Sequence, residues 1–132
     1  MATIQHIVQQ TIASSAESSS VIYAGIDASL NPGITLPESI GNAMEQTFPN
    51  KFGSMGTLSV VSCITAAIKS INEGITDAHD VVRLCGYCGL MLPVMEDIVL
   101  AARADDRSYT IRDLLLFSTV CGVGIDTVHF IL

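Results

Sequence analysis

The stretch RLCGYCGLMLPVMED, residues 83–97, decides the fold predicted for this chain. Its apolar first part ends at glycines, as a buried strand does, and Pro93 is then placed to open a helix. This order brings thiols, glycine backbone and the carboxylates of Glu96 and Asp97 to the carboxyl end of a strand. Because α/β proteins bind ligands at that edge of a sheet, the stretch predicts the location of a functional site.

Strand-like and helical segments alternate through the rest of the chain. Short apolar runs at 21–27 and 120–126 read as buried parallel strands. Hydrophobic spacing predicts further helices, which lie at about 3–16, from Pro37 onward, at 57–71 and from Thr110 onward, where Asp113 completes a capping box. The alternation predicts the α/β class. With so few strands, we expect a partial parallel α/β barrel of βα repeats, as in a fragment of a larger barrel.

The predicted organisation has two parts. Residues 1–20 form an N-terminal helix followed by a small polar linker, and residues 21–132 form the βα-repeat portion of the barrel. Charged residues make up only 14% of the chain, where about a quarter is typical of soluble domains. This low fraction predicts that much of the surface contacts other protein, either in a homo-oligomer or as the remainder of a longer chain.

Charge and cysteine usage exclude several classes of partner. The formal charge of −7, without a basic run, argues against nucleic acid as a partner. No apolar run approaches the roughly 18 residues that span a bilayer, so no membrane association is expected. The start of the chain lacks a secretory signal, and the 4 cysteines therefore read as reduced thiols of a cytoplasmic protein.

Several motifs, in the same order, resemble the C-terminal motifs of an uncharacterised family known as domain of unknown function 711, also called PFL family protein. They are YAGIDASLNP at 23–32, FGSMGTL at 52–58, GYCGLMLPVMED at 86–97 and CGVGIDTV at 121–128. The resemblance covers about residues 21–129, and it implies the last part of a longer α/β barrel related to that of pyruvate formate-lyase. It implies no established reaction. The final residues HFIL, 129–132, depart from the family pattern.

Carboxylates follow each predicted strand. Asp27, Asp97 and Asp126 would stand at strand ends as catalytic acids or bases, with Glu96 and Thr127 beside them. Hard cations such as Mg²⁺ or Ca²⁺ prefer oxygen ligands, and the metal site expected here uses Asp27, Glu96 and Asp126. The alternative is structural: Glu96 and Asp97 would favour a helix N-terminus, and Asp27 and Asp126 would accept hydrogen bonds from turn amides.

Glycines and thiols complete the predicted site. Backbone approach by a ligand is expected at Gly53, Gly56, Gly86 and Gly89, with contributions from Thr57, Cys88, Cys121 and Thr127. Cys85 and Cys88 would alternate to opposite faces of a strand, which favours buried structural thiols over a redox pair. Cys63 reads as a core residue of the helix at 57–71.

Three functions remain open from these patterns. The leading hypothesis is a polar pocket that binds a small metabolite or a divalent metal, and any other cofactor is unknown. The competing hypothesis is a non-catalytic structural or regulatory assembly module whose apolar faces bind another subunit. A remote alternative is a glycyl radical enzyme, because VVRLCGYCG at 81–89 resembles the radical signature with Gly86 as the radical residue. Whether the chain is an enzyme stays open.

Overall fold

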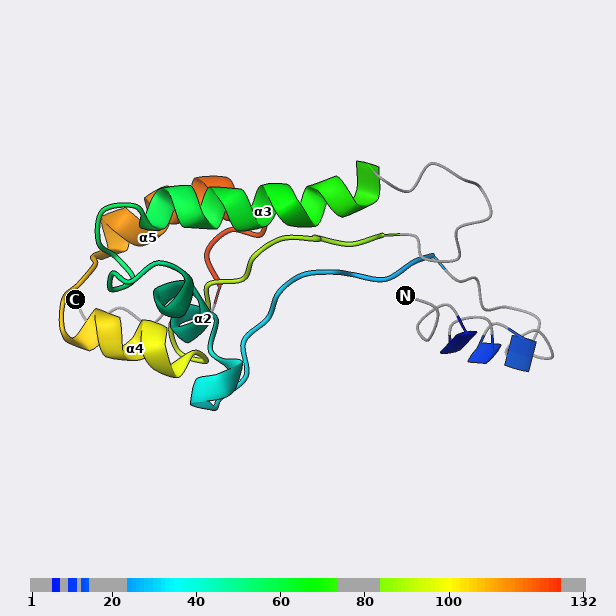
Figure 1. Ribbon diagram of the computed structural model, residues 1–132, viewed down its shortest axis with the longest axis horizontal. Helices are drawn as coiled ribbons and strands as arrows, with labels where there is room; N and C mark the ends of the chain where they lie inside the picture. The colour runs from blue at the N-terminus through cyan, green and yellow to red at the C-terminus, as the bar shows by residue number, and fades with distance from the viewer. Residues whose placement is uncertain (1–5, 8–9, 12, 15–23, 74–83, 127–132) are drawn as a thin grey trace.

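Helices dominate the computed structural model, which describes residues 24–73 and 84–126 together with 6–7, 10–11 and 13–14 (Figure 1). The elements are the 3₁₀-helix η1 (Leu36–Glu38) and the α-helices α2 (Ile40–Thr47), α3 (Thr57–Glu73), α4 (Ile98–Asp105) and α5 (Ile111–Cys121). The residues described between 6 and 14 are helical, in agreement with the helix predicted there. The predicted division near residue 20 lies outside the described residues. Among the described helices, none is both long enough and apolar enough to cross a membrane.

Polar side chains set where the helices begin. Ser39 caps α2 by accepting a hydrogen bond from the Asn42 amide. Thr110 and Asp113 form the predicted capping box of α5, which is thereby confirmed. The start predicted for α4 was wrong: Pro93 opens only a turn, and the helix begins at Ile98 because the carboxylate of Asp97 caps it.

The helices pack in pairs around a single core. Helix α3 lies along α5, and α2 contacts both α4 and η1 (Figure 1). Phe52 lies between two other aromatic rings, with edge-on centroid distances of 5.2 Å to Tyr109 and 5.4 Å to Phe117. Burying an aromatic side chain this completely stabilises a fold by about 1.5–3 kcal/mol. The remaining core residues come from every α-helix from α2 to α5 and from the segment before α4: Met44, Val60, Val61, Leu90, Leu92, Leu100, Leu114 and Cys121.

The predicted parallel α/β barrel is wrong. Within the described residues the structure contains no strand or sheet, only isolated parallel bridges between extended segments. These bridges join Ile26 to Leu84, Leu30 to Leu90, Leu90 to Gly122 and Pro93 to Asp126. The predicted strand at 120–126 is instead the end of α5 followed by a loop, and parts of the strands predicted at 21–27 and before residue 84 lie outside the described residues.

Backbone conformation explains why these apolar segments do not form strands. A ladder needs consecutive residues in the β region, but Gly86, Cys88, Gly122 and Gly124 all have positive φ. Positive φ at these positions interrupts the extended backbone between the pairings. The apolar character that suggested strands instead reflects burial, because Leu90 and Leu92 are 0% and 1% exposed in the core.

Candidate functional site

A buried carboxylate joins α2 to α4. Asp97, 1% exposed, accepts five hydrogen bonds from these two helices and the residue that caps α2. The donors are the Ser39 hydroxyl (2.7 Å) and the backbone amides of Ile40 (2.7 Å), Gly41 (3.2 Å), Val99 (3.0 Å) and Leu100 (3.0 Å). One side chain therefore caps two helices, and the interpretation of Asp97 as a helix N-terminal residue is confirmed.

Close packing keeps solvent away from this carboxylate. A Cβ at Gly41 would stand 3.0 Å from the Val99 side chain and 3.2 Å from Asp97 Oδ1, so glycine permits this approach of α2 to α4. The Tyr109 hydroxyl donates to the Leu100 carbonyl at 2.9 Å. Burial, and secondarily the charge of Asp97, raises the pKa of Tyr109. A catalytic role for Asp97 stays a prediction, but its oxygens already accept hydrogen bonds from the protein.

A second carboxylate holds an exposed loop. Asp27 Oδ1 accepts hydrogen bonds from the Ser29 hydroxyl (2.6 Å), the Ser29 amide (2.9 Å) and the Cys88 amide (3.1 Å), and Oδ2 accepts from the Tyr87 amide at 3.2 Å. The Ser29 hydroxyl is the largest cause that lowers the pKa of Asp27 to about 2, with the backbone amides adding to it. Asp27 is therefore ionised at neutral pH and exposed to solvent.

Three predicted site residues, Gly86, Cys88 and Gly89, lie on the loop that Asp27 holds, and a fourth, Cys121, lies next to it at the end of α5. A Cβ on Gly86, whose φ is +89°, would collide with the Asp27 carboxylate, which gives this glycine a steric reason that requires no radical chemistry. A Cβ on Gly89 would meet the Cys121 carbonyl at 2.9 Å. Cys88 belongs to the same loop, and the buried Cys121 contacts it through the 2.7 Å hydrogen bond from the Leu90 amide to its carbonyl.

The remaining predicted carboxylates lie elsewhere. Asp126 pairs with Pro93, at the opposite end of the 84–93 segment from the loop that Asp27 holds, and Glu96 is exposed in the turn before α4. Thr127 lies outside the described residues. In the part of the chain that is described, no group of three or more His, Cys, Asp or Glu side chains could hold a metal ion. A metal site at Asp27, Glu96 and Asp126 stays a prediction.

The loop before α3, where a ligand was expected at Gly53, Gly56 and Thr57, is closed by its own side chains. Thr57 Oγ1 accepts a hydrogen bond from the Gly53 amide at 3.0 Å and donates one to the Ser54 carbonyl at 2.9 Å. Gly53, with φ +95°, lies against Ser108 and Tyr109, where a Cβ would be only 2.6 Å from the Ser108 carbonyl. Gly56 has open space around it. Ligand binding by this loop stays a prediction.

An apolar groove lies between α2 and α3 and was not anticipated as a site. Its volume is about 320 Å³, and the described residues that line it carry no charge. Cys63 lines this groove and is exposed, so the prediction that it is a core residue was wrong. The other lining residues are Leu30, Ile40, Ala43, Met44, Thr47, Phe48, Val60, Ile64, Ala67 and Leu90. The apolar face formed by Ile40, Ala43 and Met44 was the signal that could have revealed it.

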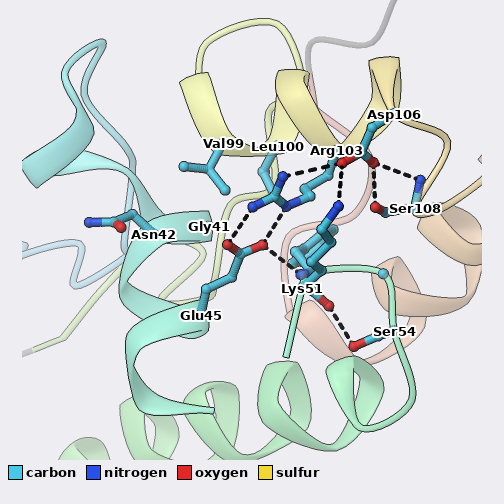
Figure 2. Close-up of polar contacts among 12 residues, drawn as sticks. Gly41, Asn42, Glu45, Lys51, Ser54, Val99, Leu100, Arg103, Asp106 and Ser108 are labelled. Carbon is cyan, nitrogen blue, oxygen red and sulfur yellow. Dashed lines mark hydrogen bonds and ion pairs between the residues drawn. The ribbon is translucent and has the colours of Figure 1, made fainter. Parts of the chain in front are cut away.

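A charged network connects α2 and α4 on another surface, and sequence reasoning missed it. Figure 2 shows the Arg103 guanidinium facing the Glu45 carboxylate, with Nε to Oε1 at 2.7 Å and Nη2 to Oε2 at 2.8 Å. Asp106 accepts from both Arg103 (3.2 Å) and Lys51 (3.0 Å). The hydrogen bond from Arg103 is the main cause that lowers the pKa of Glu45. Glu45 and Arg103 are 58 residues apart in the sequence, so no local spacing indicates the pair.

Comparison with known proteins identifies the family. The family model described as Uncharacterised ACR (DUF711) matches residues 1–130. Among curated relatives, a UPF0210 protein of Leuconostoc mesenteroides is 26% identical over 125 residues, which are 95% of this chain and 27% of that protein. A UPF0210 protein of Sulfurisphaera tokodaii is 26% identical over a match that covers 86% of this chain and 24% of that protein. A UPF0210 protein of Acetivibrio thermocellus is 29% identical over a match that covers 82% of this chain and 23% of that protein.

The chain therefore spans about a quarter of the length of these curated relatives. No solved structure is significantly similar to it. The family match extends over almost the whole chain and includes the loops around Asp27 and Asp97. This chain belongs to the uncharacterised DUF711 family, whose curated relatives are named UPF0210 proteins.

Proposed function

We propose that this chain is a non-catalytic assembly module whose apolar groove between α2 and α3 packs against another part of the family domain. The observation that carries the proposal is the groove itself, which has a volume of about 320 Å³ and an uncharged lining. Phe48 and Leu30 border it and are 50% and 45% exposed. Burying a fully exposed apolar side chain contributes about 1.5–3 kcal/mol, and covering the exposed half of each of these two side chains would contribute roughly half of that.

The length of the relatives supports the choice of partner. In those proteins the matched segment is only about a quarter of the chain, so the rest of the domain is available to cover the corresponding surface. A groove between two helices suits a third helix whose apolar stripe repeats at i, i+3, i+4 and i+7. The partner segment is therefore expected to be an amphipathic helix, which makes few charged contacts in the groove.

A binding experiment tests this proposal. The probe is the Acetivibrio thermocellus relative without the 108 residues that match this chain. Wild-type chain should bind the probe, and Ala67→Glu should weaken binding by about tenfold or more, because it places a charge inside an apolar interface. Ala66→Glu is the matched control: Ala66 is an exposed alanine on the same helix that does not line the groove. Equal effects of the two substitutions, or no binding of wild type, would contradict the proposal.

A second candidate is the binding of a small metabolite or a divalent cation at the Asp27 loop. It is favoured by one observation: the ionised carboxylate of Asp27 is exposed beside Gly86, Cys88 and Gly89. Calorimetric titration with Mg²⁺ and Ca²⁺ tests the cation form. Binding that is lost in Asp27→Asn would support it, and the absence of binding by either cation would contradict it. In this second candidate function, Asp97 and Asp126 are proposed to take part in the site together with Asp27.

The finer implications of the family resemblance remain proposals. They are that the chain corresponds to the last part of the family domain and that the domain is related to pyruvate formate-lyase. A separate proposal, from the likeness of residues 81–89 to the radical signature, is that Gly86 carries a radical. An EPR doublet after anaerobic activation would support the radical, and an EPR-silent sample would contradict it. Cytoplasmic location and self-association are likewise predictions, and size-exclusion chromatography with mass measurement tests the latter.

A further inference from the structure

The loop that Asp27 holds brings the Cys88 thiol against the backbone of Cys85. The Cys88 sulfur lies 3.3 Å from the Cys85 carbonyl oxygen. Three residues of extended chain would span roughly 10 Å, so residues 85–88 are curled. The curl follows from the Tyr87 and Cys88 amides, which both donate to the single carboxylate of Asp27. The strand on which alternation to opposite faces was predicted is therefore absent at residues 85–88.

Backbone conformation at this loop favours the same geometry. Gly86 has φ +89°, and Cys88 has φ +46°, one of the few positive values at a residue other than glycine among those described. A positive φ at a side-chain-bearing residue is uncommon and is held here by the contacts of the loop. Cys85 and Cys88 are both half-buried free thiols, and the Tyr87 side chain between them is exposed. Small solutes can therefore reach the pair.

We propose that Cys85 and Cys88 form a redox-active dithiol that exchanges with low-molecular-weight disulfides, such as oxidised glutathione, and closes to an intramolecular disulfide. This site is distinct from the proposed docking groove and does not depend on it. Its two cysteines have the spacing of a Cys-x-x-Cys motif.

The reaction balances in two exchange steps. The thiolate of one cysteine attacks a sulfur of oxidised glutathione, which releases one glutathione thiolate and leaves a mixed disulfide on the protein. The thiolate of the other cysteine then attacks the protein sulfur of that mixed disulfide and releases the second glutathione. The protein loses two electrons and two protons, and both end on the two glutathione thiols.

Closure of the disulfide is compatible with the pairings that flank the loop. The Cys85 amide donates to the Ile26 carbonyl at 3.0 Å, and the Leu30 amide donates to the Gly89 carbonyl at 2.9 Å. Both contacts use backbone atoms outside the side chains that would react. The disulfide is therefore expected to form without displacing the extended segments on either side.

Mass spectrometry of the whole chain tests the proposal. Reduced protein is equilibrated with mixtures of reduced and oxidised glutathione, quenched with acid, alkylated and cleaved with trypsin. The peptide at 84–103 contains Cys85 and Cys88 and no other cysteine, while Cys63 falls in the peptide at 52–69. In oxidising mixtures the peptide at 84–103 should lose two hydrogens and take no alkyl group, and dithiothreitol should reverse this change.

The exposed Cys63 serves as an internal control. Without a neighbouring thiol to resolve it, Cys63 should carry glutathione, whereas on the peptide at 84–103 the disulfide should exceed the glutathione adduct by about tenfold. This ratio is expected when glutathione is well below the millimolar effective concentration of an adjacent thiol. Cys85→Ser and Cys88→Ser should each trap glutathione on the remaining thiol. Wild-type peptide that keeps both thiols, or keeps stable glutathione adducts, at every mixture would overturn the proposal.

Discussion

Asp97 and Asp27 make the same kind of contact in two different environments. Each carboxylate accepts hydrogen bonds from backbone amides that lie about 60 residues away in the sequence. Asp97 is buried and joins two helices through their first amides, whereas Asp27 is exposed and joins two extended segments. If the carboxylate is removed, water cannot reach the buried donors that Asp97 satisfies, but it can reach the exposed donors that Asp27 satisfies.

This difference in burial predicts that Asp97 stabilises the whole fold, whereas Asp27 stabilises only its own loop. Removing an acceptor from buried donors costs their full desolvation, while exposed donors simply turn to water. Asp97 should therefore determine whether α2 and α4 stay together, and Asp27 should determine only the conformation of its loop. The predictions below use this contrast, from the largest expected effect on stability to the smallest.

Asp97→Ala is expected to have the largest effect. It leaves the Ser39 hydroxyl and four backbone amides without their acceptor, so the free energy of unfolding should fall by about 3 kcal/mol or more. Urea unfolding followed by circular dichroism measures this loss. Asp105→Ala, an exposed aspartate at the other end of α4, should change stability by less than about 0.5 kcal/mol. A loss below about 1 kcal/mol for Asp97→Ala would contradict the double cap.

Glu45→Gln tests an ion pair of intermediate exposure. The neutral amide removes the negative charge and can accept only one of the two short hydrogen bonds from Arg103, and we expect a loss of about 1–2 kcal/mol at neutral pH. Because the pKa of Glu45 is lowered from its ordinary 4.5, this contribution is complete above pH 4.5 and is lost as the pH falls through the lowered value. Unfolding curves of both proteins across this range should therefore converge in acid.

Glu38→Gln provides the comparison for that pH dependence. Glu38 accepts from the neutral hydroxyl of Thr35 at 2.7 Å rather than from a cation, so its replacement should produce a smaller change. A difference between wild type and Glu45→Gln that stays constant from pH 7 to well below 4.5 would mean that the ion pair is not its source.

Thr110→Ala examines an exposed cap that serves only one helix. Thr110 and Asp113 satisfy each other's donors at the start of α5, and loss of the hydroxyl should cost about 1 kcal/mol. Thermal unfolding measures the change. Thr119→Ala, which removes an exposed hydroxyl near the end of the same helix, is the control and should cost less. If Thr110→Ala matched Asp97→Ala, burial would not be what distinguishes the two caps.

Asp27→Asn should have the smallest effect on global unfolding and a clear local one. Amide hydrogen exchange at Tyr87 and Cys88 should accelerate several-fold, because both amides lose a charged acceptor. In wild type the contact should persist to low pH, since the pKa of Asp27 is lowered from 3.8 to about 2 and the contact is lost only as the pH falls through that value. Unchanged exchange at both amides would refute the loop assignment.

Local signals in the sequence predicted much of the helical structure. The helix at 57–71 is confirmed as Thr57–Glu73, and the Thr110–Asp113 capping box is confirmed, because both depend on residues within a few positions of each other. The strands failed because apolar runs report burial without specifying φ. Leu90 is fully buried, yet positive φ at Gly86 and Cys88 interrupts the pairing that a strand would need.

The candidate site was less predictable because it depends on long-range contacts. Asp97 could be predicted to cap its own helix, but its capping of α2 needs Ser39 and Ile40, which are 58 and 57 residues away. Cys63 was misjudged because a helix of small apolar residues gives no indication of which side is covered. The side that faces α5 is packed, whereas the side that carries Cys63 and Ala67 borders the groove.

Protection of the Cys63 thiol tests the proposed assembly role most directly. Cys63 is exposed and lines the groove, so a maleimide should modify it rapidly in the isolated chain. Adding the remainder of the Acetivibrio thermocellus relative should slow this modification by about tenfold or more, measured on the tryptic peptide at 52–69. An unchanged rate at saturating concentrations of that polypeptide would contradict the conclusion that the groove is the docking surface.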